Sequence, residues 1–156
     1  MIRTLESLIK TLDVVKIFGP QTIKINCLQS DSRLIKKDSL FVAIKGLRVD
    51  SHQLIGKVIK KGARVIVGEE KPKKQWLKQV TYVQVNNSKE ALGIIASNWF
   101  GCPSQKMKII GVTGTDGKTT TANLIYEIIK NSNQKVGVIS TLGAKIDKDY
   151  YDTGCM

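Results

Sequence analysis

The sequence is poor in aromatic and sulphur-containing side chains and has no long hydrophobic run. Of its 156 residues, 6% are aromatic, three are cysteine and one is histidine. No run approaches the ~20 consecutive apolar residues of a membrane-spanning helix. The first residues lack the long apolar core of a signal peptide. We therefore expect a cytoplasmic protein that does not enter the membrane.

Cysteine and histidine are too few and too scattered for several kinds of chemistry. Cys27, Cys102 and Cys155 are odd in number and widely spaced, which favours a reducing compartment over a disulfide framework. No spacing typical of a transition-metal site is present. His52 is the only histidine, so the sequence offers no Ser–His–Asp arrangement. We expect His52 to lie in the first turn of a helix rather than to act as a ligand.

Hydrophobic residues (42%) and charged residues (24%) occur in the proportions of a globular protein. Apolar residues recur at helical spacing in some segments and form short runs or alternate in others. The pattern predicts helices over residues 4–12, 51–61, 88–100 and 122–130, and strands over residues 23–28, 40–44, 64–68, 81–85, 107–112 and 135–141. Residues 101–104, Gly-Cys-Pro-Ser, form a linker between two α/β modules.

A glycine-rich loop lies between the predicted strand 107–112 and the helix that follows. Residues 111–121 read Gly-Val-Thr-Gly-Thr-Asp-Gly-Lys-Thr-Thr-Thr. Backbone N–H groups at a helix N-terminus attract phosphate, and a lysine such as Lys118 reaches the outer phosphates. The hydroxyl of Thr119 is placed to ligate Mg²⁺. The pattern predicts a nucleoside triphosphate site, although Val112 stands where the usual spacing has glycine; the alternative is a structural turn with a solvated lysine.

Two groups of motifs, in the right order, resemble the Mur ligases, the ATP-dependent amino-acid-adding enzymes of peptidoglycan synthesis. The first group is Asp-Ser-Arg at residues 31–33, Asp-Ser-Leu-Phe-Val-Ala-Ile-Lys-Gly at 38–46 and Asp-Ser-His at 50–52. The second is the loop itself. Among members of this family, the enzymes that add the third amino acid are the most similar. Ser51 replaces a usual glycine, and Asp116 a common asparagine.

The resemblance implies an α/β fold of two parts. Residues 1–104 form a small N-terminal α/β domain that binds the UDP-sugar, and residues 105–156 form the incomplete beginning of a P-loop, parallel-sheet ATP domain. It implies that Ser32 binds the UDP-sugar and that the backbone of Leu47, Arg48 and Val49 lies near the uracil. It also implies that Thr119 binds Mg²⁺ and that ATP is bound by the loop residues Gly114, Thr115, Asp116, Gly117, Lys118, Thr119 and Thr120.

The function implied is ligation of diaminopimelate or lysine to UDP-N-acetylmuramoyl-L-alanyl-D-glutamate through an acyl phosphate. The family's remaining catalytic groups, and the domain that holds the amino acid, have no counterpart in these residues. We therefore expect a monomeric fragment that contains no complete catalytic set and is inactive alone. Alternatives are a fragment of a ligase that acts at the fourth step and a non-catalytic nucleotide-binding module.

The basic excess is concentrated in the first module. Residues 1–106 carry 19 of the 25 Lys and Arg side chains and eight of the 13 Asp and Glu side chains, a net charge of +11. Such a charge is compatible with nucleic-acid binding, with attraction of a UDP-sugar, or with a solvated lysine-rich face. No interleaving of aromatic and basic residues suggests base stacking, so a basic nucleic-acid-binding protein is the least favoured alternative. Much of the excess lies in Lys57, Lys60, Lys61, Arg64, Lys71, Lys73, Lys74 and Lys78.

Overall fold

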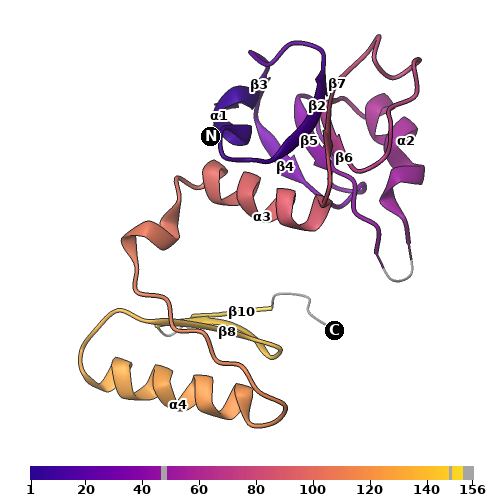
Figure 1. Cartoon of the computed structure of the whole chain (residues 1–156). Coiled ribbons are helices and arrows are strands. Elements are labelled where there is room, and N and C mark those ends of the chain that lie inside the picture. The colour runs from indigo at the N-terminus through magenta and orange to yellow at the C-terminus, as the bar shows by residue number, and fades with distance from the viewer. Residues whose placement is uncertain (47–48, 148, 153–156) are drawn as a thin grey trace. The chain divides into compact units, whose positions relative to one another are not determined.

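The chain divides into two units, and each is described here by itself. The structure is a computed structural model that describes residues 1–46, 49–147 and 149–152 (Figure 1). The first unit is Met1–Met107, and the second begins at Lys108. Among the described residues, no helix is both long and apolar enough to cross a membrane.

A five-stranded sheet forms the centre of the first unit. Its strand order is β2-β7-β6-β5-β4, and β4 to β7 run parallel while β2 pairs antiparallel with β7 at one edge. The predicted α/β class is therefore confirmed, and the sheet of this unit is largely parallel. The strands are β2 (Val14–Phe18), β4 (Cys27–Gln29), β5 (Ser39–Val42), β6 (Ala63–Gly68) and β7 (Thr81–Val85).

Helices cover both faces of this sheet, so its central strands are buried on both sides. Alternate residues of β5 enter different hydrophobic clusters: Leu40 and Val42 pack with α1 (Leu5–Ile9) and α3 (Ser88–Trp99), and Phe41 packs with α2 (Ile55–Lys60). Figure 1 shows α1 and α3 on one side of the sheet and α2 on the other.

Several predicted elements of the first unit are confirmed with small changes. The strand predicted at 81–85 is β7, and the helix predicted at 88–100 is α3, capped by the Asn87 side chain. The helix predicted at 51–61 begins as a 3₁₀ turn, η1 (Ser51–Leu54), and continues as α2. The helix ends at Lys60, and Gly62, whose φ of +104° favours glycine, follows two residues later.

One prediction for this unit was incomplete, and one strand of the main sheet was missed. The single strand predicted at 23–28 is two strands, because β3 (Lys24–Ile25) pairs with β1 (Arg3–Thr4) whereas β4 joins the main sheet. Strand β2 was not predicted. The short 3₁₀ helix η2 (Pro103–Lys106) lies near the end of the unit.

The second unit contains α4 (Lys118–Asn131) and the antiparallel strands β8 (Gly137–Ser140), β9 (Gly143–Ile146) and β10 (Asp149–Tyr151). The prediction of a buried strand at 107–112 was wrong: the segment belongs to no strand, and the side chains of Ile109 and Ile110 are exposed. A parallel strand needs a partner across a long crossover, whereas β8 obtains an antiparallel partner after a two-residue turn. The strand predicted at 135–141 therefore lies in a hairpin meander.

Candidate functional site

A surface hollow of about 390 Å³ lies where β4 ends and where the chain enters η1. Its walls come from two segments that are separated in sequence, and in α/β sheets ligands bind at the carboxyl ends of parallel strands. The structure thus brings Ser32 and Val49, both predicted to contact the UDP-sugar, to one hollow. Leu47 and Arg48 lie outside the described residues. The lining residues are Ser30, Asp31, Ser32, Arg33, Val49, Ser51 and Leu54.

The first wall is a tight turn held by an ion pair. The Arg33 guanidinium donates from Nη2 to Asp31 Oδ2 at 2.7 Å and from Nε to both carboxylate oxygens at 3.0 Å, and the Arg33 backbone N–H donates to Oδ1 at 2.8 Å. These side-chain bonds, followed by the backbone bond, lower the pKa of Asp31 to about 2. The pair therefore stays ionised at neutral pH, and Ser32 is fixed between its two members.

The Ser32 hydroxyl is available to a ligand. It has no hydrogen-bond partner within the part of the chain that the structure describes, and Ser32 lines the hollow. The Ser32 carbonyl oxygen, in contrast, accepts a hydrogen bond of 2.9 Å from the Lys61 ammonium.

The second wall is connected to the residue that follows β6 through His52, which is buried with 5% of its surface exposed. Its Nε2 accepts a hydrogen bond from the Glu69 N–H at 3.1 Å, so the ring proton lies on Nδ1 and is donated to Asp50 Oδ1 at 2.7 Å. The His52 backbone N–H donates to the same oxygen at 2.9 Å. These two bonds, the backbone one first, lower the pKa of Asp50. His52 lies in the first turn of η1, as predicted.

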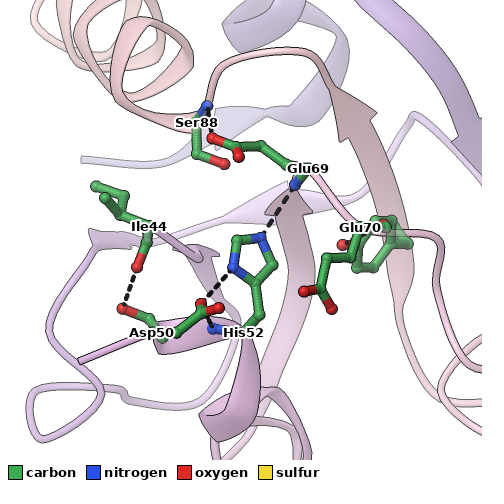
Figure 2. A network of polar contacts seen from close by, with 8 residues as sticks. Ile44, Asp50, His52, Glu69, Glu70 and Ser88 are labelled. Atoms are coloured by element: carbon green, nitrogen blue, oxygen red, sulfur yellow. Dashed lines mark hydrogen bonds and ion pairs between the residues drawn. The ribbon is translucent and has the colours of Figure 1, made fainter. Parts of the chain in front are cut away.

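The network continues from His52 to the start of α3 (Figure 2). Glu69 Oε1 accepts a hydrogen bond of 2.9 Å from the Ser88 N–H, and the Tyr82 hydroxyl donates to the Glu70 carbonyl at 2.9 Å. Burial raises the pKa of Tyr82. Sequence reasoning missed Glu69 and Tyr82, because their roles depend on the register of β6 beside β7.

The side chains of Asp50, His52 and Glu70 are the group in the described chain that could hold a metal ion, with ligand atoms within 4.8 Å of one another. Both ring nitrogens of His52 already have hydrogen-bond partners, however. A metal ion would have to displace at least one of these bonds. We therefore assign the group a structural role in holding the second wall.

The glycine-rich loop forms a second candidate site, within the second unit. Gly114 and Gly117 have φ of +148° and +73°, values that favour glycine, and α4 begins directly afterwards at Lys118. The first backbone N–H groups of a helix have no intrahelical acceptors, so Lys118, Thr119 and Thr120 offer donors to an anion. Residues 114–118 and 120 are exposed, which leaves the loop accessible.

The Lys118 ammonium is held by its own loop, since it donates to the carbonyls of Gly114 at 2.6 Å and Thr115 at 2.8 Å. Lys118 and Thr119 also lie on the wall of a groove of about 330 Å³ between residues 108–112, α4 and β8. A positive charge, free N–H groups and a threonine hydroxyl thus converge at one helix start. That arrangement fits a Mg²⁺-bound nucleoside phosphate.

Comparison with known proteins decides between the families that share such loops. Residues 24–100 match the model described as "Mur ligase family, catalytic domain", and residues 112–154 match "Mur ligase middle domain". The chain belongs to the Mur ligase family. Both groups of motifs that carry the resemblance lie within the matched residues or directly beside them.

Relatives that match over nearly the whole chain carry one name, UDP-N-acetylmuramoyl-L-alanyl-D-glutamate–2,6-diaminopimelate ligase. The protein of this name from Parabacteroides distasonis is 43% identical over 150 residues, which is 96% of this chain and 30% of the relative. That from Clostridium perfringens is 39% identical and covers 95% of this chain and 30% of the relative. The chain thus spans about 30% of the length of the curated relatives it matches.

Solved structures of the family show the same fold. A structure of a UDP-N-acetylmuramoyl-L-alanyl-D-glutamate–2,6-diaminopimelate ligase superposes with a TM-score of 0.73 at 19% identity, and covers 96% of this chain and 30% of that one. MurF from Acinetobacter baumannii superposes with a TM-score of 0.62 at 26% identity, and covers 84% of this chain and 28% of that one.

Proposed function

We propose that this chain carries the UDP-sugar-binding domain, and the first part of the ATP-binding domain, of a ligase that adds diaminopimelate or lysine to UDP-N-acetylmuramoyl-L-alanyl-D-glutamate. The observation that carries the proposal is the hollow that joins Ser32 to Val49. The names of the relatives from P. distasonis and C. perfringens support the third-step reaction over the fourth-step one. We place the boundary between the two domains after residue 104.

In the proposed reaction the γ-phosphate of ATP moves to a substrate carboxylate, which leaves ADP and an acyl phosphate. An amino group then attacks the acyl carbon, loses a proton and displaces inorganic phosphate as the amide bond forms. Lys118 would bind the β- and γ-phosphates, and the N–H groups at the start of α4 would orient them. Thr119 would contribute a hydroxyl ligand to Mg²⁺, which when bound neutralises charge on the transferred group. In the hollow, the Ser32 hydroxyl would donate to the diphosphate of the UDP-sugar.

In this proposal the residues of the chain bind the substrates, and none of them forms or breaks a covalent bond. We propose that the protein acts as a cytoplasmic monomer. We expect the 156-residue chain alone to release no phosphate when given ATP, the UDP-sugar and an amino acid. A phosphate-release assay on the purified chain tests this, and release that depends on both the UDP-sugar and the amino acid would contradict it.

The binding proposal is tested by titrating the full chain with UDP-N-acetylmuramoyl-L-alanyl-D-glutamate and following backbone amides by NMR. We expect saturable shifts at Ser32, Arg33 and Val49. Ser32→Ala should weaken binding about tenfold, because a hydrogen bond to a charged phosphate is lost. Ser104→Ala is the control, since Ser104 is exposed and lies far along the chain in η2. Absence of saturable binding, or equal affinity of the two variants, would refute the proposal.

A further inference from the structure

Lys61 differs from the other basic side chains of residues 57–78 in what it contacts. Its ammonium donates to the Ser32 carbonyl at 2.9 Å, across 29 residues of sequence. Arg64 pairs instead with Asp38 at 3.5 Å, and the Lys73 ammonium lies over the Trp76 ring. In the described chain, the side chains of Lys57, Lys60, Lys71, Lys74 and Lys78 have no polar partner.

The backbone at the end of α2 fixes where Lys61 lies. The Lys61 N–H donates to the carbonyls of Lys57 and Val58, and the next N–H, that of Gly62, donates to Ile59. Gly62 then takes a left-handed φ that turns the chain into β6. The helix is anchored by the buried side chains of Ile55, Val58 and Ile59. Lys61 therefore extends toward the Ser32 turn from a rigid support.

Charge at the hollow also depends on Lys61. Asp31 and Arg33 neutralise each other through their paired hydrogen bonds. The Lys61 ammonium bonds to a neutral carbonyl, so its positive charge is not cancelled by an ion pair in the residues described. A charged donor on the Ser32 carbonyl both orders the turn and leaves a positive potential beside the hollow.

We propose that Lys61 is a positioning residue of the UDP-sugar site, which holds the Ser32 turn in the conformation that receives the diphosphate. This inference rests on the proposed function, because it assumes that the hollow binds an anionic nucleotide sugar. It accounts for one lysine of residues 57–78 through a specific contact, whereas the other lysines there contribute only to the net positive charge.

The test compares four forms of the 156-residue chain: wild type, Lys61→Met, Lys61→Arg and the control Lys60→Met. Lys60 is exposed, is the last residue of α2 and directly precedes Lys61. It carries the same charge, so its variant matches the change in net charge. Binding of UDP-N-acetylmuramoyl-L-alanyl-D-glutamate is measured by calorimetry, the free-state amide shifts of Ser32 and Arg33 by NMR, and the melting temperature by fluorescence.

We expect Lys61→Met to raise Kd about tenfold and to shift the Ser32 and Arg33 amides of the free protein, with an unchanged melting temperature. Lys61→Arg should restore affinity to within about threefold, because its guanidinium can donate to the same carbonyl. Equal Kd values for Lys61→Met and Lys60→Met would overturn the inference alone. A wild-type chain without saturable binding would overturn the proposed function itself, and the inference with it.

Discussion

Gly68 lies at the end of β6, where the polar network leaves no space for a side chain. A Cβ at this position would overlap the Tyr82 hydroxyl and lie 3.2 Å from the His52 ring. Both groups are buried and hydrogen-bonded, so neither can move without loss of a bond. The glycine therefore permits the close approach of β6, β7 and η1 that supports the second wall of the hollow.

We predict that Gly68→Ala lowers the free energy of unfolding by about 1–3 kcal/mol, as overpacking of a rigid site does. Gly93→Ala in α3 is the control. No atom lies within 4 Å of its added methyl group, and alanine should stabilise the helix by about 0.5–1 kcal/mol. Urea unfolding followed by tryptophan fluorescence measures both variants. Equal effects of the two substitutions would contradict the packing argument.

Tyr82 gives a prediction about alkaline pH. Burial raises the pKa of its hydroxyl, so the folded chain holds this proton more tightly than the unfolded chain does. The resulting stability is complete below about pH 10, the ordinary pKa of tyrosine, and is lost as pH rises further. We expect the free energy of unfolding to fall more steeply above about pH 10 in the wild type than in Tyr82→Phe.

At neutral pH, Tyr82→Phe should cost about 1 kcal/mol, because the Glu70 carbonyl loses its donor. Tyr150→Phe serves as the control, since Tyr150 is exposed in the second unit. A pH dependence of Tyr82→Phe that matches the wild type would show that this hydroxyl does not cause the alkaline loss.

Among the elements, the inner strands of the sheet were predicted, whereas the edge strand β2 was not. β7, Thr-Tyr-Val-Gln-Val, is rich in β-branched and aromatic residues and was predicted at its full length. β2 was missed because its more exposed and less exposed residues do not alternate regularly at the sheet edge. Its partner, β7, also lies more than 60 residues later. Residues 107–112 have the composition of a buried strand, but this segment pairs with no strand among the residues that the structure describes.

The candidate site, too, was predicted only in part. The motif at 31–33 and Val49 were named from the family resemblance, and in the structure they line the two walls of the hollow. The support behind the second wall could not be read from local patterns, because the His52 ring contacts Glu69, 17 residues away. Hydrogen bonds of this kind depend on sheet register, which short motifs do not encode.

The glycine-rich loop gives a prediction at the scale of an element. Lys118→Ala removes the cation that we propose to face the nucleotide phosphates, so the affinity of the chain for Mg²⁺-ATP should fall about tenfold or more. Lys135→Ala is the control, since Lys135 is exposed and its side chain makes no hydrogen bond or ion pair with the described residues. Calorimetry with ATP measures both. If Lys118→Ala bound ATP like the control, the loop would be a structural turn.

The first unit has a hydrophobic core of its own. Both of its hydrophobic clusters are composed of residues between Leu5 and Trp99. We predict that residues 1–107 fold alone, with a fluorescence melting temperature within about 5 °C of the full chain, a difference that corresponds to roughly 1 kcal/mol. Both tryptophans, Trp76 and Trp99, report on this unit.

The same truncated chain should bind the UDP-sugar with an affinity within about twofold of the full chain, because every described residue of the hollow is retained. Circular dichroism and the NMR titration check folding and binding separately. An unfolded truncated chain would show that the first unit depends on residues after 107.

The burial of β5 on both faces also governs how this protein can vary. All four of its residues are buried, and neighbours along the strand pack into opposite clusters. In a saturation library, positions 39–42 should tolerate the fewest replacements, and deletion of one residue would exchange the contents of the two layers. The exposed segment 73–75 lies between elements and should accept insertions. Sequence changes that accumulate in this domain during evolution should therefore be rare in β5 and frequent in the connections between elements.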